Sequence, residues 1–234
     1  MSKKVLITGG NKGIGLEVAK IFLIMEYEVF VVARDFENFE LGGLPHVTEI
    51  EADLANLDNI QFIVEAVGDI DVLINNAGFM QPHITYDNYT AQDREKMMNV
   101  NLYAPVELMN AFSKSMIKNK SGRVVNVASI AGQIGHPDVW YGIAKAGLIN
   151  ATKIYAKLLG KEGIVVNCIA PSPVETAMQN SNSKERIEEF KKTVITGRFA
   201  QPTEVARTIV WLAVGCPDYI NGTCIDINNG SYPR

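Results

Sequence analysis

Val5-Leu-Ile-Thr-Gly9-Gly10-Asn-Lys-Gly13-Ile-Gly15 is the stretch that decides the fold of this 234-residue chain. Its apolar start predicts a buried strand over residues 3–8, and the apolar spacing after the glycines predicts a helix over residues 14–25. Glycines in such a turn let the backbone approach a pyrophosphate, which the free N–H groups and the dipole of the following helix can bind. A tight strand-to-helix connection or a methyltransferase nucleoside site would look similar, but the strand-turn-helix context favours dinucleotide binding.

The end of the second predicted strand, residues 28–33, bears on which dinucleotide binds. In dinucleotide folds this strand end meets the adenosine ribose, and an acidic side chain there binds a free 2′-hydroxyl. Here Ala33 ends the strand and Arg34 follows, so Arg34 and Lys12 can bind a 2′-phosphate, which predicts NADP(H) in preference to NAD(H). If Asp35 faced the ribose the preference would reverse, and Arg34 would also fit a surface side chain paired with Asp35.

Short apolar runs alternate with longer amphipathic stretches from end to end. This alternation predicts right-handed βαβ crossovers, and hence one α/β, doubly wound parallel sheet with helices on both faces over residues 1–234. Because Pro105 lies inside a helical pattern, we expect a kink or break near Tyr103. The other predicted strands are 46–53, 71–75, 123–128, 164–169 and 224–227, and the other helices are 56–67, 91–118, 139–159, 184–194 and 203–214.

The composition excludes several classes of protein. A formal charge of −4 without long basic runs argues against nucleic acid or an anionic membrane as the main partner. No apolar stretch approaches the length of a membrane span, and the apolar run at the N-terminus is too short for a signal peptide, so we expect a cytoplasmic protein. Three cysteines without a C-x-x-C pair and three scattered histidines predict neither a disulfide framework nor a metal site.

A second group of polar residues follows the predicted strand 123–128. Ser129 comes directly after it, and Tyr141 and Lys145 lie four residues apart on one face of the next helix. An ammonium near a phenol lowers the phenol pKa, which makes Tyr141 a candidate proton donor, and Ser129 can bind the same substrate oxygen. A Tyr-x-x-x-Lys pair by itself is more often an unremarkable surface pair.

Taken together, these motifs resemble those of the short-chain dehydrogenase/reductase family, in its compact single-domain branch. The resemblance spans nearly the whole chain, and the motifs occur in the family's order. The matching segments are Thr8-Gly9-(x)3-Gly13-x-Gly15, Asp53-Leu54, Asn75-Asn76-Ala77-Gly78, Asn101, Ser129, Tyr141-(x)3-Lys145 and Pro171-Ser-Pro-Val174-Glu-Thr176.

The resemblance implies a Rossmann-like sheet of about seven strands in the order 3-2-1-4-5-6-7, and hydride transfer between NADP(H) and a carbonyl or secondary alcohol. Tyr141 would exchange a proton with the substrate oxygen, which Ser129 would hold. Lys145 would bind the nicotinamide ribose and lower the Tyr141 pKa, and Asn101 would hold a water that links Lys145 to solvent. The implied cofactor contacts are Thr8, Gly9, Asn11, Lys12, Gly13, Ile14, Gly15, Arg34, Asp53, Leu54, Asn76, Ala77, Gly78, Tyr141, Lys145, Pro171, Val174 and Thr176.

The chain departs from the family pattern where the substrate would bind. The capping loop has Pro171-Ser172-Pro173 in place of Pro-Gly, and the spacing between Ser129 and Tyr141 is one residue shorter than usual. Residues 178–199 are expected to form a substrate loop or lid. The side chains that we expect to shape the pocket are Phe79, His83, Tyr86, Tyr89, His136, Trp140 and Phe190.

Substrate and assembly leave alternatives open. Many relatives reduce 3-oxoacyl groups on acyl carrier protein; Lys120 stands at one basic docking position, but Glu162 has the wrong sign at the other, so an unspecified small carbonyl compound is favoured. The alternative from another functional class is a non-catalytic NADPH-binding sensor. The presence of all four expected catalytic residues, Asn101, Ser129, Tyr141 and Lys145, argues against it. The family also implies a homodimer or homotetramer, for which the helical regions 91–118 and 139–159 can supply a four-helix interface.

Overall fold

The computed structural model describes residues 2–81, 84–177 and 184–233. Within these ranges one parallel sheet of seven strands has the order β3-β2-β1-β4-β5-β6-β7, which confirms the predicted fold and strand order. The order reverses between β1 and β4, so the carboxyl ends of these two strands diverge into helices on opposite faces. The strands are β1 (Lys4–Thr8), β2 (Glu28–Ala33), β3 (Val47–Glu51), β4 (Val72–Asn75), β5 (Gly122–Val127), β6 (Ile164–Pro171) and β7 (Cys224–Ile227).

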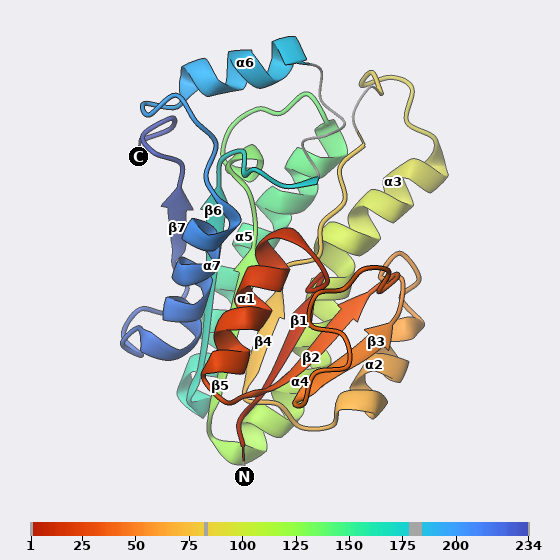
Figure 1. The fold of residues 1–234 in the computed structure, drawn as a ribbon, viewed down its shortest axis with the longest axis vertical. Helices are drawn as coiled ribbons and strands as arrows, with labels where there is room; N and C mark the ends of the chain where they lie inside the picture. Colours follow the sequence, from red (N-terminus) through yellow and green to blue (C-terminus); the bar gives the residue numbers. More distant parts are fainter. Residues whose placement is uncertain (1, 82–83, 178–183, 234) are drawn as a thin grey trace.

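Helices cover both faces of the sheet (Figure 1). On one face α1 (Gly13–Ile24) and α7 (Pro202–Val210) pack together over a core that includes Phe22. On the other face lie α2 (Asn59–Val67), α4 (Ala104–Asn119) and α5 (Val139–Leu159), whose core includes Phe112. Two further helices, α3 (Ala91–Met98) and α6 (Lys184–Thr193), lie towards the carboxyl end of the sheet. No helix of the described residues is long and apolar enough to cross a membrane.

The predicted break near Tyr103 is present as a π-helical turn, η1 (Asn99–Tyr103), between α3 and α4. Pro105 has no N–H to donate to the Asn101 carbonyl four residues earlier, so a regular α-helix cannot continue through this point. Instead the Ala104 N–H bonds to the carbonyl of Asn99, five residues back. The turn places Asn99, Val100 and Asn101 in the interior near the end of β4.

Two other predicted helices differ from the observed ones at their ends. The 56–67 helix begins at Asn59, because the Asp53 and Asn56 side chains accept bonds from the backbone of residues 55 and 58 and form turns there. The 203–214 helix is α-helical only to Val210 and continues as a π-helical turn, η5 (Trp211–Gly215).

A chain of buried polar side chains ties the middle of the sheet to α5. Asn75 donates to Asn126 across β4 and β5 at 2.8 Å, and Asn126 donates to the Thr152 hydroxyl of α5 at 3.0 Å. Thr152 in turn donates to the carbonyl of Leu148 at 2.9 Å. Since buried amides cost free energy unless they are paired, this chain fixes how α5 sits on the sheet, and hence where the residues at its N-terminal end lie.

Candidate active site

A cavity of about 500 Å³ opens at the carboxyl ends of the strands. Its wall contains the β1–α1 turn, the ends of β2 and β5, the start of α5, and the segment after β6. This is the place, beside the reversal of strand order, where parallel α/β sheets bind their ligands. Phe190 and Thr193 of α6 close the wall on one side, together with Ser231 near the C-terminus.

The β1–α1 turn is built for close backbone approach. A Cβ atom on Gly15 would lie 2.2 Å from the carbonyl oxygen of Gly9, and one on Gly9, whose φ is +64°, would lie 3.0 Å from Cα of Ala77. No side chain caps the first turn of α1, whose N-cap residue is Lys12. The N–H groups and the positive dipole end of α1 therefore remain available to an anion in the cavity, which fits the pyrophosphate of a dinucleotide.

Side-chain hydrogen bonds hold this turn to its neighbours. Asn76 donates to the carbonyls of Thr8 and Gly9 at 2.9 and 3.0 Å, and the Thr8 hydroxyl accepts from the backbone of Asn76 and Ala77. Asn11 donates to the carbonyl of Asp35 at 2.9 Å, which fastens the turn to the end of β2. The β1–α1 turn therefore has its shape before any ligand binds.

At the end of β2 the cavity wall contains Ala33, Arg34 and Asp35. Arg34 and Asp35 are exposed, and neither Arg34 nor Lys12 forms a salt bridge with any residue that the structure describes. Arg34 is thus a surface side chain, as the alternative expected, but it forms no salt bridge with Asp35. Both cations line the cavity, and neither would have to leave an ion pair to meet an anionic group there.

Most of the expected cofactor contacts line the cavity. Thr8 and Gly15 do not belong to its wall: Thr8 is buried and bonds to the β4 end, while Gly15 packs against Gly9. Thr176 lies opposite Gly13, since a Cβ on Gly13 would meet the Thr176 methyl at 3.2 Å. The residues brought together there are Gly9, Asn11, Lys12, Gly13, Ile14, Arg34, Asp53, Leu54, Asn76, Ala77, Gly78, Tyr141, Lys145, Pro171, Val174 and Thr176.

The Pro171-Ser172-Pro173 loop continues β6 instead of turning away from it. The Ser172 N–H bonds to the carbonyl of Ile227 at 2.9 Å, and Val174 forms a parallel bridge with Ala200. The loop is thus held on both sides, with Pro171 to Val174 in the cavity wall.

Ser129, Tyr141 and Lys145 meet in the cavity wall. The Ser129 side chain interacts with Tyr141 in a way that lowers the tyrosine pKa, and the Ser129 oxygen accepts from the N–H of Ala131 at 3.1 Å. Lys145 lies with Nζ 5.6 Å from the centre of the Tyr141 ring and donates to the carbonyl of Val127 at 2.9 Å. The structure thus brings these three side chains together in one wall, and their roles towards a substrate stay predictions.

The expectation that Lys145 lowers the Tyr141 pKa is wrong for this structure. Burial raises the Tyr141 pKa, the Ser129 hydrogen bond opposes this, and the charge of Asp138 raises the pKa further. Burial also lowers the Lys145 pKa to about 8. The spacing in the sequence indicates the charge partner of Tyr141 but not the loss of solvation that both groups suffer on burial.

Asn101 lies behind the cavity wall. Its amide donates to the carbonyls of Phe79 and Met97 at 2.7 and 2.9 Å, and its oxygen accepts from the N–H of Phe79 at 3.2 Å. The side chain is thereby committed to joining the π-helical turn to the segment after β4. A role for Asn101 in holding a water stays a prediction.

Asp138, which sequence reasoning missed, is a buried carboxylate at the N-terminal end of α5. It accepts from the N–H of Tyr141 at 3.1 Å, from the Tyr89 hydroxyl at 2.7 Å and from the N–H of Gln81 at 3.0 Å. A helix-capping pattern, Asp138 just before the apolar run of α5, was available in the sequence as a signal. The contacts to Gln81 and Tyr89 were not, since they join distant segments.

The side chains expected to shape the substrate pocket divide into groups. Phe79, His136 and Phe190 line the cavity. Tyr86 is exposed and Tyr89 is buried behind the wall, while Trp140 lies near Arg94, so these three are not in the cavity wall. His83, like residues 178–183 of the expected lid, lies outside the described residues. No group of three or more potential metal ligands occurs among the described residues.

Comparison with known proteins agrees with this geometry. A family model described as enoyl-(acyl carrier protein) reductase matches residues 9–231. The chain is 31% identical over 251 positions to the 3-oxoacyl-[acyl-carrier-protein] reductase FabG of Staphylococcus aureus, with 99% of each chain covered. The chain belongs to the short-chain dehydrogenase/reductase family.

Solved structures of other proteins are similar throughout the fold. A 3-oxoacyl-[acyl-carrier protein] reductase from Brucella melitensis matches with a TM-score of 0.91 and 27% identity, over 99% of this chain and 92% of that one. The structure of ElxO with NADP bound matches with a TM-score of 0.87 and 29% identity, over 99% of both chains. This member of the family is accordingly an oxidoreductase that interconverts a carbonyl and an alcohol with a nicotinamide cofactor.

Burial of Lys145 makes stability depend on pH in a defined direction. Its pKa is about 8 in the folded protein against an ordinary value of 10.5 for a lysine in water. Below pH 8 the amine is charged in both states and folding carries the full desolvation cost; between about pH 8 and 10.5 that cost disappears, because the folded state loses its proton first. We expect Lys145→Met to be more stable than the wild type at neutral pH, by up to roughly 3 kcal/mol, with the gap closing as pH rises through this window.

Chemical denaturation of both proteins from neutral to alkaline pH measures this gap. Lys118→Met, which changes an exposed lysine of α4, serves as the control and should show no such closing gap. If the difference in unfolding free energy between Lys145→Met and the wild type stayed constant with pH, the lowered pKa of Lys145 would be contradicted.

Proposed function

We propose that the protein is an NADPH-dependent carbonyl reductase in which Tyr141 is the general acid. The observation that carries the proposal is that Ser129, Tyr141 and Lys145 share one cavity wall with an uncapped glycine turn. The nicotinamide, when bound, supplies the hydride. Substrate binding and proton transfer are carried out by side chains of this protein.

In the proposed mechanism the substrate carbonyl oxygen lies between the Ser129 and Tyr141 hydroxyls. Ser129 donates a hydrogen bond to that oxygen, and Tyr141 transfers its proton to it as the carbonyl is reduced. Because burial raises the Tyr141 pKa, the phenol stays protonated at neutral pH, which is the form that reduction needs. Lys145, which lies against the Tyr141 ring, would bind the ribose beside the nicotinamide.

Replacing Tyr141 with Phe tests the assignment of the acid. We expect kcat for NADPH-dependent reduction to fall about 10²- to 10⁴-fold, as is typical when a general acid is removed, while the affinity for NADPH is retained. Turnover is followed by NADPH absorbance and affinity by its fluorescence. Tyr155→Phe is the matched control, since Tyr155 lies on the same helix but bonds to Asn110 away from the cavity.

This comparison also separates an enzyme from a sensor. A non-catalytic NADPH-binding module would bind the cofactor and turn over no carbonyl compound, with or without Tyr141. Turnover that survives in Tyr141→Phe would refute the mechanism.

The unpaired cations Lys12 and Arg34 support a preference for NADPH over NADH. A guanidinium can form two charge-assisted bonds with the 2′-phosphate, each worth about 1.5–3 kcal/mol. We therefore expect Arg34→Ala to lower kcat/KM with NADPH about tenfold to a hundredfold and to change kcat/KM with NADH much less. A wild type that prefers NADH would contradict the phosphate contact, as would an Arg34→Ala variant that loses both cofactors equally.

For the substrate we propose a small, largely apolar carbonyl compound. The part of the wall beyond Tyr141 contains Phe79, Met80, Ile134, Pro137 and Phe190, which suits an apolar body next to the carbonyl. Lys96, stacked on the Phe79 ring at 4.6 Å, and His136 add polar groups to this part.

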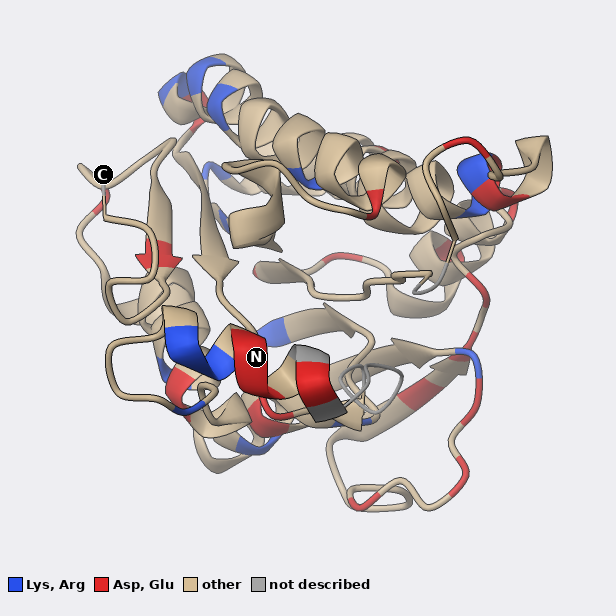
Figure 2. Ribbon diagram, turned by 90° about the horizontal axis from the view of Figure 1, so that it is seen from above, with Lys and Arg blue, Asp and Glu red and all other residues tan. Residues whose placement is uncertain are grey.

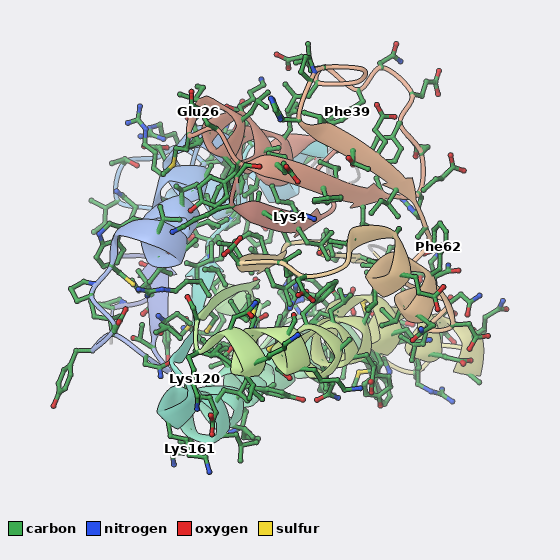
Figure 3. The ribbon with its side chains drawn as sticks, turned by 90° about the horizontal axis from the view of Figure 1, so that it is seen from below. Lys4, Glu26, Phe39, Phe62, Lys120 and Lys161 are labelled. Atoms are coloured by element: carbon green, nitrogen blue, oxygen red, sulfur yellow. The ribbon has the colours of Figure 1, made fainter. Side chains whose placement is uncertain are left out.

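Reduction of 3-oxoacyl groups on acyl carrier protein is the second candidate, favoured by the likeness to FabG. The residues at the two expected docking positions argue against it. Lys120, labelled in Figure 3, precedes β5 and lies at the end of the sheet opposite the cavity. It forms a 2.8 Å salt bridge with Glu162, which precedes β6 at the same end. On the cavity side, acidic segments lie beside basic ones (Figure 2). A screen of carbonyl compounds that includes 3-oxoacyl thioesters, free and on carrier protein, distinguishes the candidates.

We also propose that the protein acts in the cytoplasm as a homodimer or homotetramer. Three apolar residues of α5, Ile143, Ile154 and Leu158, are 47%, 48% and 58% exposed and would be covered by a second copy. Leu158→Lys should shift the mass measured by light scattering towards the monomer, because it places a charge in that contact. An unchanged mass would place the interface elsewhere.

A further inference from the structure

We propose that Asp138 is a positioning residue that joins the two walls of the substrate half of the cavity. One wall is the β4–α3 connection, by which we mean the described residues 76–81 and 84–90, and it includes Phe79 and Met80. The other wall is formed by His136 and Pro137, just before α5. Asp138 bonds to both walls. The inference rests on the proposed function only in taking the ligand between these walls to be a carbonyl substrate.

The two carboxylate oxygens of Asp138 have separate partners. Oδ1 accepts from the N–H of Tyr141 and from the Tyr89 hydroxyl, while Oδ2 accepts from the N–H of Gln81 at 3.0 Å. One oxygen thus caps α5, and the other holds the residue that follows Met80. Loss of the bonds from Gln81 and Tyr89 would free the β4–α3 connection relative to Tyr141.

The preceding turn is locked in the same way. The Asp138 N–H donates to Nδ1 of His136 at 3.1 Å, and the His136 ring packs against the Tyr141 ring with centroids 5.5 Å apart. His136 therefore keeps a fixed place in the cavity wall beside the proton donor.

Stability alone is a poor explanation for this arrangement. Asp138 is 6% exposed and forms no salt bridge within the described part of the chain. A buried carboxylate that is neutralised by no cation is costly unless every lone pair is used, and an apolar residue would pack at lower cost. What the carboxylate provides is a bond from one helix end to a connection 49 and 57 residues away in sequence.

Asp138 also acts on Tyr141 through its charge. The carboxylate raises the Tyr141 pKa, so its removal should lower that pKa and move the alkaline fall of kcat to lower pH. The titratable or charged groups around Asp138 and Tyr141 are Tyr89, Asp93, Arg94, His136 and Lys145.

Asp138→Asn separates these effects from the helix cap. Asn is as good an N-cap as Asp, so its oxygen can keep the bonds to Tyr89 and to the Tyr141 N–H. Its NH₂ group would then face the Gln81 N–H, donor against donor. We expect faster hydrogen exchange at Gln81 and residues 84–90, a KM about tenfold higher for the best substrate of the carbonyl screen, and an alkaline limb of kcat at lower pH.

Two variants make the comparison specific. Tyr89→Phe removes one bond but leaves the carboxylate charged, so it should loosen the connection and raise KM without moving the pH limb. Asp93→Asn changes a second carboxylate near Gln81, which bonds to the Gln81 side chain and to Thr90 rather than to α5. It should leave the pH limb in place.

The outcomes decide between the proposal and a purely structural role. If Asp138→Asn only lowers the melting temperature, with unchanged KM, exchange and pH limb, the positioning role is wrong. If the wild type reduces no carbonyl compound, the proposed function fails, but the exchange at Gln81 and residues 84–90 still shows whether Asp138 holds that connection. The affinity for NADPH is measured as a control. If Asp138→Asn weakened NADPH binding, the higher KM would come from the cofactor-binding part of the cavity and the positioning role would be wrong.

Discussion

The close approach of three backbone segments around Gly9 governs the nucleotide half of the molecule. Gly15 packs against the Gly9 carbonyl and Ala77 against the Gly9 Cα, at distances that leave no room for a side chain. This contact sets how near α1 lies to the gap between β1 and β4, and hence where its uncapped N-terminus points. Asn76 bonds to the same backbone, so the segment after β4 cannot move without the turn.

The catalytic half depends on a different kind of contact, namely polar groups buried in the core. The Asn75, Asn126 and Thr152 chain fixes α5 on the sheet near its middle, and the Asp138 carboxylate fixes its N-terminal end. Between these two points Tyr141 and Lys145 have little freedom. Their pKa values move in opposite directions, as burial requires for an acid and a base that both lose water.

The fold could be predicted from the sequence because each of its signals is local. The apolar run Val5-Leu-Ile, the glycine turn and Pro105 each act on their own neighbours, and all seven strands follow the predicted pattern. Ser129, Tyr141 and Lys145 also follow from local motifs. The bond from Tyr89 to Asp138 joins distant segments, and the burial of Lys145 results from the packing of distant segments around it. No spacing in the sequence predicts either of them. The error in the Tyr141 pKa has the same origin.

The π-helical turn at residues 99–103 has a consequence for the geometry of the long helical region. A π-turn holds one residue more than an α-turn would over the same rise, and one residue corresponds to about 100° of rotation around the axis. A continuous α-helix would place Val100 and Phe112 about 120° from each other around the axis. The extra residue of the π-turn reduces this angle to about 20°, so Val100 packs in the same core as Leu108 and Phe112 while it also lines the cavity. The break beside Pro105 thus keeps the same side of the helical region turned towards the core before and after the turn.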